Sequence, residues 1–212
     1  MADFDLDSTI KNGIRNMQLH ARHVIVSSTV NWELSAQFLI NYPRLQSITW
    51  EEGSSRPKVI REPWRSATYV ELNKVFKHSP NVGLIISQFA YRREAPRAAY
   101  AMRDMLAANI VEIGVEDSGD LSPSDNLQDL LIASTRIERV NFHFGLHNVI
   151  PCPFDPRRGR LPPIKRLTFP EVYSWDYNPE SMSQIWDFSQ LQDLTIAWHL
   201  LGNFLNAFYR RI

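Results

Sequence analysis

The chain has 212 residues, of which 44% are hydrophobic and 22% are charged, and its 23 basic residues equal its 23 acidic residues in number. This composition is typical of a globular protein and excludes the disordered, collagen-like and disulfide-rich classes. Zero net charge gives no overall field that favours nucleic acid or an anionic membrane, and the single Cys152 cannot form an internal disulfide. We expect one soluble domain over residues 1–212, in an intracellular, cytoplasmic or nuclear location.

A six-residue window with apolar residues at its first, fourth and sixth places recurs along the chain. Residues two apart share one face of a strand, so each window predicts a short strand with an inward face. In chain order the windows are a weak Ile14-Met17-Leu19, then Leu45-Ile48-Trp50, a looser Val82-Ile85-Ser87, Ile110-Ile113-Val115, Ile137-Val140-Phe142, Ile164-Leu167-Phe169 and Leu191-Leu194-Ile196.

Amphipathic helices are predicted ahead of most of these windows, because apolar residues there follow a spacing of three or four and then one. The helical patterns are Leu34-Phe38-Leu39, Leu72-Val75-Phe76, Met102-Met105-Leu106, Leu127-Leu130-Leu131 and Met182-Ile185-Trp186.

The last four windows are equally spaced, because they begin at positions 110, 137, 164 and 191. One helix-strand unit of this length cannot bury its own apolar face, whereas stacked units share a continuous core. We therefore expect an α/β solenoid, an arc with a parallel sheet on its concave side, helices on its convex side and repeats of about 27 residues. A doubly wound α/β sheet is the alternative, but it gives no reason for a fixed spacing.

These units resemble the leucine-rich-repeat family in its long, helix-containing form. The segments LPPIKRLTF and WDFSQLQDLTI in particular resemble the repeat region of fungal F-box and leucine-rich-repeat proteins. The resemblance implies a protein-recognition scaffold, and we find no F-box in the chain. The Asn or Cys that usually follows the triplet in such repeats is also replaced here.

Residues between the inward positions of each strand are expected to face away from the core, onto the concave face. A charged ridge on that face is the candidate binding surface for a protein partner, and its residues are Glu112, Glu116, Arg139, His143 and Arg166. The alternative is that these charges only pair across neighbouring strands.

Two irregular insertions interrupt the regular pattern. In residues 51–68, Trp64 is expected to cover Leu84 and Ile86, which the windows place on the concave face; a hydrophobic hot spot for a partner is the competing interpretation. Residues 146–163 are rich in proline, which favours an extended loop over a helix. This loop is a second candidate binding segment, with Arg157, Arg158 and Arg160, or a solvated loop without that role.

No motif for phosphate binding, nucleophilic catalysis or a compact metal site is found, and we expect no enzyme activity, no cofactor and no metal. His143, His147, Cys152 and Asp155 could be combined into a zinc set, but their spacing matches no compact site.

We expect a recognition scaffold that binds a protein of unknown identity through the concave face and the irregular loops, without nucleic acid or membrane. The first alternative is the substrate-receptor part of an F-box type ubiquitin-ligase assembly. The second is an enzyme on an α/β scaffold with His143, His147 or Cys152 in its site. The apolar end at residues 203–212 could also support self-association.

Overall fold

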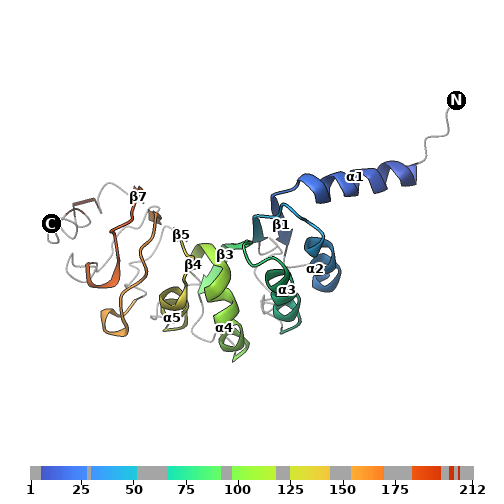
Figure 1. Ribbon diagram of the computed structural model, residues 1–212. Helices are drawn as coiled ribbons and strands as arrows, with labels where there is room; N and C mark the ends of the chain where they lie inside the picture. The colour runs from blue at the N-terminus through green and yellow to red at the C-terminus, as the bar shows by residue number, and fades with distance from the viewer. Residues whose placement is uncertain are drawn as a thin grey trace. The chain divides into compact units, whose positions relative to one another are not determined.

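The computed structural model describes residues 6–27, 30–51, 66–91, 97–117, 125–143, 154–169, 183–196, 201–202 and 205. The chain divides into two compact units, residues 1–83 and 84–212. The first unit contains α1 (Leu6–His20), β1 (His23–Ser27), α2 (Trp32–Ile40), β2 (Ser47–Glu51) and α3 (Ser66–His78) (Figure 1). The second contains β3 (Gly83–Tyr91) from Leu84 on, α4 (Arg97–Asn109), β4 (Ile110–Asp117), α5 (Asp125–Ala133), β5 (Arg139–His143), the short 3₁₀ helix η1 (Pro156–Arg158), β6 (Arg166–Phe169) and β7 (Asp193–Ile196).

The fold is α/β with a sheet of parallel strands, as the alternation of helices and strands predicts. In the first unit β1 pairs in parallel with β2, and in the second unit the strands from β3 to β7 pair in parallel with their neighbours in chain order. Parallel neighbours require crossover connections, and helices supply most of the described ones. None of the described helices is long and apolar enough to cross a membrane.

In the first unit, α2 and β2 build the core. Asn31 caps α2, since its side-chain oxygen accepts a hydrogen bond from the backbone nitrogen of Leu34 at 3.2 Å. Trp32 is buried at the start of the helix, and its ring lies 4.9 Å from that of Trp50 on β2. The helical face differs from the expected one at Leu34, whose side chain points to solvent and is 63% exposed.

The weak first window, Ile14-Met17-Leu19, was expected to form a strand and is instead part of α1. Ile10, Ile14 and Met17 are spaced by four and three, a helical spacing, and all three are exposed. The first strand is β1, which follows α1 directly and pairs in parallel with β2, Val24 opposite Ile48 and Val26 opposite Trp50. The strand prediction for residues 14–19 is therefore wrong.

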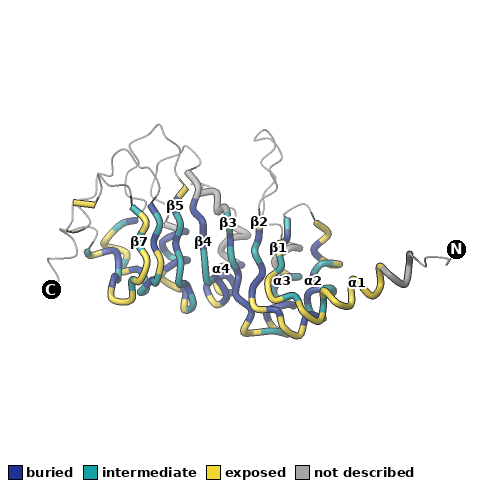
Figure 2. Tube along the Cα trace, turned by 90° about the horizontal axis from the view of Figure 1, so that it is seen from above, coloured by how far each residue is buried: buried dark blue, intermediate teal, exposed yellow. Residues whose placement is uncertain are grey.

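In the second unit, strands β4 to β7 pair in a constant register. Glu112 is opposite Arg139, Arg139 opposite Arg166, and Arg166 opposite Asp193, so each step along the chain equals the interval between the last four windows. The expected inward residues of β4, β5 and β6 are buried, whereas those of β7 are partly exposed. Buried and more accessible residues alternate along β5 and β6 (Figure 2). On β5 and β6 the inward Phe142 and Phe169 stack with ring centroids 5.2 Å apart.

The expected register of β3 is wrong by one residue. Leu84 and Ile86 are buried, whereas Ile85 between them is partly exposed. Ile86 is opposite Ile113, and the register with β4 shifts on both sides of the Ile85–Ile86 pair. Because Leu84 and Ile86 belong to the core, no cover is needed for them, and Trp64, the expected cover, lies outside the described residues.

Of the two expected insertions, the structure describes only parts. In residues 51–68, Glu51 ends β2 and the last three residues begin α3, while residues 52–65 lie outside the described ranges. In residues 146–163, the described part starts at Phe154 and holds the single turn of η1 in place of a full helix.

Candidate functional site

One face of the second unit's sheet carries a row of charged side chains, one from each of four neighbouring strands. The row consists of Glu112 on β4, Arg139 on β5, Arg166 on β6 and Asp193 on β7, and we name it the charged row. These positions alternate with the buried apolar ones, so the row lies on the face opposite the core. The order of charges across the strands is negative, positive, positive, negative.

Two ion pairs organise the charged row. Nη1 of Arg139 lies 2.8 Å from Oε2 of Glu112, and Nε of Arg166 lies 2.7 Å from Oδ2 of Asp193. Each pair joins neighbouring strands, which is the cross-strand pairing expected as the alternative for these charges. The two arginines are opposite each other on β5 and β6, and each is neutralised by a carboxylate on its outer side.

The charged row is accessible to a partner. The side chains of Arg166 and Asp193 are 55% and 60% exposed, and that of Arg139 is 41% exposed. At this exposure each ion pair contributes about 0–1 kcal/mol to folding, because water screens the attraction. Much of the hydrogen-bonding capacity of the arginines therefore faces solvent.

A row of uncharged polar residues runs beside the charged row. Asn141 is opposite Thr168, and Thr168 is opposite Thr195. The amide of Asn141 donates to Oε1 of Glu112 at 2.8 Å, which fixes the carboxylate that also holds Arg139. The two rows together present side chains that can donate and accept hydrogen bonds.

Gly114 occupies the β4 position of this polar row for a steric reason. A Cβ at Gly114 would lie 2.0 Å from the carbonyl oxygen of Ser87 on β3, far inside contact distance. The register between β3 and β4 shifts between Ile86 and Phe89, and Ser87 lies in this irregular stretch. A side chain at position 114 is thus excluded by backbone.

Glu116 and His143, the remaining expected ridge residues, are opposite each other at the ends of β4 and β5. His143 is exposed. The side chain of Glu116 lies outside the described residues, so its part in the ridge stays a prediction.

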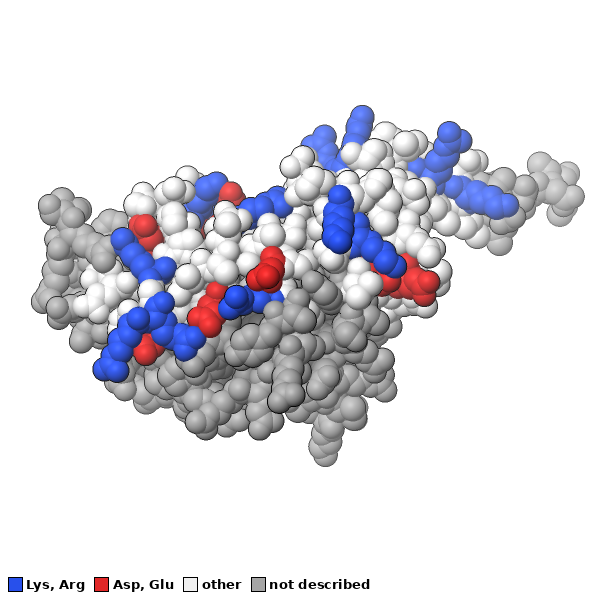
Figure 3. Space-filling view, turned by 60° about the horizontal axis from the view of Figure 1, so that its bottom comes forward, with Lys and Arg blue, Asp and Glu red and all other residues white. Residues whose placement is uncertain are grey.

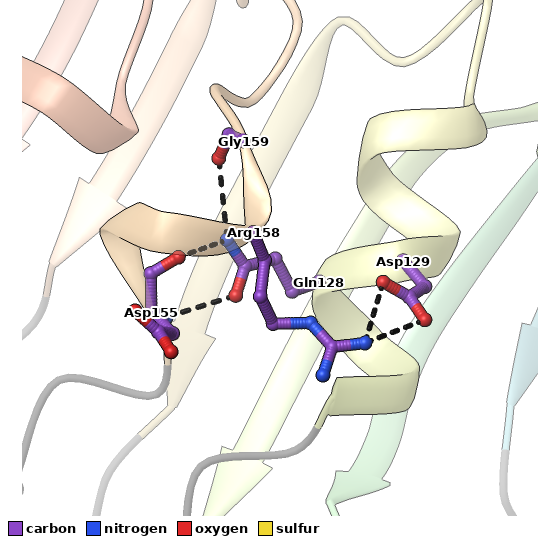
Figure 4. A network of polar contacts seen from close by, with 5 residues as sticks. All are labelled: Gln128, Asp129, Asp155, Arg158 and Gly159. Atoms are coloured by element: carbon purple, nitrogen blue, oxygen red, sulfur yellow. Dashed lines mark hydrogen bonds and ion pairs between the residues drawn. The ribbon is translucent and has the colours of Figure 1, made fainter.

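The loop that carries the expected arginines is attached to α5 by a buried amide (Figure 4). Oε1 of Gln128 accepts a hydrogen bond from the backbone nitrogen of Asp155 at 2.8 Å. Nε2 of Gln128 donates to the carbonyl oxygens of Asp155 at 2.8 Å and Gly159 at 3.3 Å. Gln128 is 1% exposed, so these bonds hold both ends of η1 against the helix.

The three loop arginines have different environments. Arg158 points toward α5, where Nη2 contacts both carboxylate oxygens of Asp129 at 2.9 and 2.8 Å (Figure 4). Arg160 donates to the carbonyl oxygen of Trp186 at 3.2 and 3.1 Å. Arg157 is exposed, and among the described residues its side chain forms no ion pair. Two of the three arginines therefore hold the loop in place.

Sequence reasoning missed several polar contacts. The windows place Asp193 on the concave face, one interval after Arg166, but it was not among the expected ridge residues. Lys165 and Glu138, one residue before Arg166 and Arg139, form an ion pair of 2.6 Å. In the first unit, Nδ1 of His23 and Oγ of Ser47 lie 2.8 Å apart on opposite residues of β1 and β2.

The residues considered for catalysis or metal binding are only partly described. His147 and Cys152 lie outside the described ranges. Asp155 is the N-cap of η1, and its Oδ1 accepts from the backbone nitrogen of Arg157 at 2.9 Å. Across the described ranges, no group of three or more His, Cys, Asp or Glu side chains is arranged to hold a metal ion.

Charges of both signs occur on the described surface shown in Figure 3.

Comparisons with family models, with curated proteins and with solved structures find no match to this chain.

Proposed function

We propose that this protein is a leucine-rich-repeat-like solenoid that acts as a recognition scaffold, and that it binds a protein partner through the charged row. The solenoid part of the proposal is supported by the constant step along the chain between opposite positions on β4, β5, β6 and β7. A repeated unit of helix or loop followed by a strand accounts for that step.

The observation that carries the binding proposal is the accessibility of a polar face on a parallel sheet. Parallel sheets in α/β proteins are usually covered on both faces and are then apolar on both. Here the face with the charged row carries ionised and hydrogen-bonding side chains that are partly open to solvent. A protein partner can cover this face while it keeps those groups hydrogen-bonded.

The charged row also supplies a specific pattern. Its order of negative, positive, positive and negative charges is fixed by neighbouring strands and by two ion pairs. A rigid pattern of this kind favours a partner with the complementary order and penalises partners with like charges at the same places.

An exchange of charges within one ion pair tests the proposal. The double variant Arg166→Asp, Asp193→Arg keeps the net charge and a pair of opposite charges between β6 and β7, but it changes the order of the row. The matched control is Arg103→Asp, Asp104→Arg, which exchanges an exposed pair on α4. Tagged wild-type protein and both variants are used to capture partners from cells that express the protein, followed by mass spectrometry.

We expect a discrete protein that is captured by the wild type and by the α4 control and is lost from the charged-row variant. The proposal is wrong if every partner is captured equally by all three forms. A third exchange, Arg158→Asp with Asp129→Arg, tests in the same way whether the loop around η1 takes part.

A further inference from the structure

The described side chains of helix α1, from Ile10 to His20, have almost no packing against the rest of its unit. It extends away from α2 and β1 (Figure 1), and every residue from Ile10 to His20 except Gln18 is exposed. Among these residues Ile10, Ile14 and Met17 have exposed fractions of 51%, 38% and 54%. The helix therefore has an apolar side that no described part of its own unit covers.

A helix of this kind gains stability from a partner. Isolated helices shorter than about 12–15 residues are marginal in water even when they are rich in alanine. Helix α1 has fifteen residues, and Asn12, Gly13 and Asn16 in its middle have low helix propensity. Burial of the apolar side against a partner adds to the stability of such a helix.

The apolar side is a narrow stripe formed by Ile10, Ile14, Met17 and Ala21, with spacings of four, three and four. The backbone nitrogen of Ala21 donates to the carbonyl oxygen of Met17 at 2.8 Å, so Ala21 continues the helical turn. This alternating spacing is the seam of a two-helix coiled coil. It is narrower than the broad apolar face of membrane-surface helices, and it has no aromatic residue.

We propose that the occupant of this stripe is the same stripe of a second copy of the chain, in an antiparallel arrangement. In that arrangement Ile10 lies against Ala21 of the second copy, and Ile14 lies against Met17 of the second copy. The same two contacts recur in reverse order by symmetry, as a two-fold dimer requires. The large Ile10 at one end thus meets the small Ala21 at the other, and the stripe is complementary to itself.

The residues that flank the stripe agree with this pairing. On one side Lys11 comes opposite Gln18 of the second copy, and on the other side Gly13 comes opposite His20 of the second copy. No two like charges come opposite each other, and the second cation of the helix, Arg15, is on the outer surface. A Cβ at Gly13 would have nothing within 4 Å in the single chain. Position 13 is therefore open in the single chain, and the glycine has no side chain that would meet His20 of the second copy.

The antiparallel direction is favoured over the parallel one for two reasons. The helix dipoles of an antiparallel pair attract each other. In addition, α1 leads directly into β1. A parallel pair would therefore place the strands and helices that follow α1 in the two copies at the same end of the pair, whereas an antiparallel pair places them at opposite ends.

The first test is the mass of the full-length protein in solution as a function of concentration, by light scattering after size exclusion. A single pair of short helices buries less than the about 1,200–2,000 Å² of a standard interface, so we expect a concentration-dependent dimer of twice 24.6 kDa. Ile14→Asp is expected to abolish the dimer. Leu19→Asp is the matched control, because Leu19 is exposed on the side of α1 away from the stripe, and it is expected to leave the dimer intact.

The second test is a disulfide cross-link in a Cys152→Ser background. Ile10→Cys protein mixed with Ala21→Cys protein is expected to give a mixed disulfide dimer. Each variant alone is expected to give none, since two copies of residue 10 would be about 16 Å apart along the axis of the proposed pair, too far for a disulfide.

A wild-type protein that stays monomeric over the whole concentration range would overturn the proposal. So would a dimer that survives Ile14→Asp, because it would use another surface. Disulfides formed by Ile10→Cys alone would show a parallel pair and would overturn the antiparallel arrangement. The charged row is not involved in any of these outcomes, so they are independent of the proposed binding function.

Discussion

At the scale of single residues, Gly114 shows how backbone geometry decides a residue type on the candidate binding face. It occupies an outward position of β4, opposite the polar Asn141 of β5, which is in turn opposite Thr168 of β6. The carbonyl of Ser87 approaches so closely that any side chain would collide with it. The sequence does not reveal this approach, because it arises from an irregular pairing between β3 and β4.

Gly114→Ala is expected to destabilise the protein. The added Cβ meets backbone atoms of Ser87 at 2.0 and 2.9 Å, and backbone cannot move aside as a flexible side chain can. We expect the free energy of unfolding to fall by about 1–3 kcal/mol, the usual cost of overpacking. Chemical denaturation measures the change, with Gly202→Ala as the control because a Cβ there meets nothing within 4 Å. Equal stability of the two variants would contradict the described approach of Ser87.

Tyr42 links the stability of the first unit to alkaline pH. Burial raises the pKa of the Tyr42 phenol above its ordinary value, because the ionised form is poorly solvated there. The ring packs edge-on against Phe38 at 5.2 Å. A raised pKa in the folded state gives a stabilising contribution that is complete below the unfolded value of about 10 and is lost as the pH rises above it.

Tyr42→Phe is therefore expected to reduce the loss of stability at alkaline pH. The measurement is the free energy of unfolding of both proteins near neutral pH and above about pH 10. All other titrating groups are the same in the two proteins. The difference between their losses of unfolding free energy at alkaline pH is therefore the contribution of Tyr42. If the wild type and the variant lose the same amount of stability, burial of the phenol does not control this dependence.

At the scale of elements, Gln128 couples α5 to η1. Its amide satisfies three backbone groups of the loop, at Asp155 and Gly159, from a position that is almost fully buried. The side chain of Arg158 adds an ion pair to Asp129 one residue further along α5. These two contacts differ in burial, and so in their expected energy.

Gln128→Leu is expected to cost about 1–3 kcal/mol of unfolding free energy, because it leaves partly buried backbone groups of Asp155 and Gly159 without this partner. Asp129→Asn removes a partly exposed ion pair and is expected to cost only about 0–1 kcal/mol. Denaturant unfolding of both variants compares the two contacts directly. A larger cost for Asp129→Asn than for Gln128→Leu would mean that the ion pair, not the amide, holds the loop.

Most of the elements could be predicted from spacing alone. The windows that start at Leu45, Ile110, Ile137, Ile164 and Leu191 each contain or lead into a strand, and four of the helical patterns lie on α2, α3, α4 and α5. The inward positions of a strand and one face of a helix must both be apolar. Apolar residues therefore recur about every 2 residues in a strand and about every 3.6 residues in a helix, and the two spacings distinguish the elements.

The errors occurred where a pattern fits two structures. Ile14, Met17 and Leu19 satisfy the strand window, but with Ile10 they also satisfy a helix, and the strand-forming run Val24-Ile25-Val26 follows immediately. In β3 three consecutive apolar residues, Leu84 to Ile86, do not fix which of them face inward. The pairing with β4 fixes it, and that information is not local.

At the scale of the whole molecule, the candidate site was only partly predictable. The equal spacing of the windows predicted that Arg139 and Arg166 are neighbours on one face, and the pairing of β5 with β6 confirms this. The contacts of Arg158 and Arg160 could not be predicted, because Asp129 and Trp186 come from other units of the pattern and meet the loop only after packing.

Recognition of a protein partner by the charged row is tested most directly by isothermal titration of the captured partner. The partner is titrated against the wild type, the Arg166→Asp, Asp193→Arg variant and the Arg103→Asp, Asp104→Arg control. We expect binding to the charged-row variant to be weaker by at least about tenfold, equivalent to about 1.4 kcal/mol, with the control unchanged. Equal affinity for all three proteins would contradict recognition through the charged row.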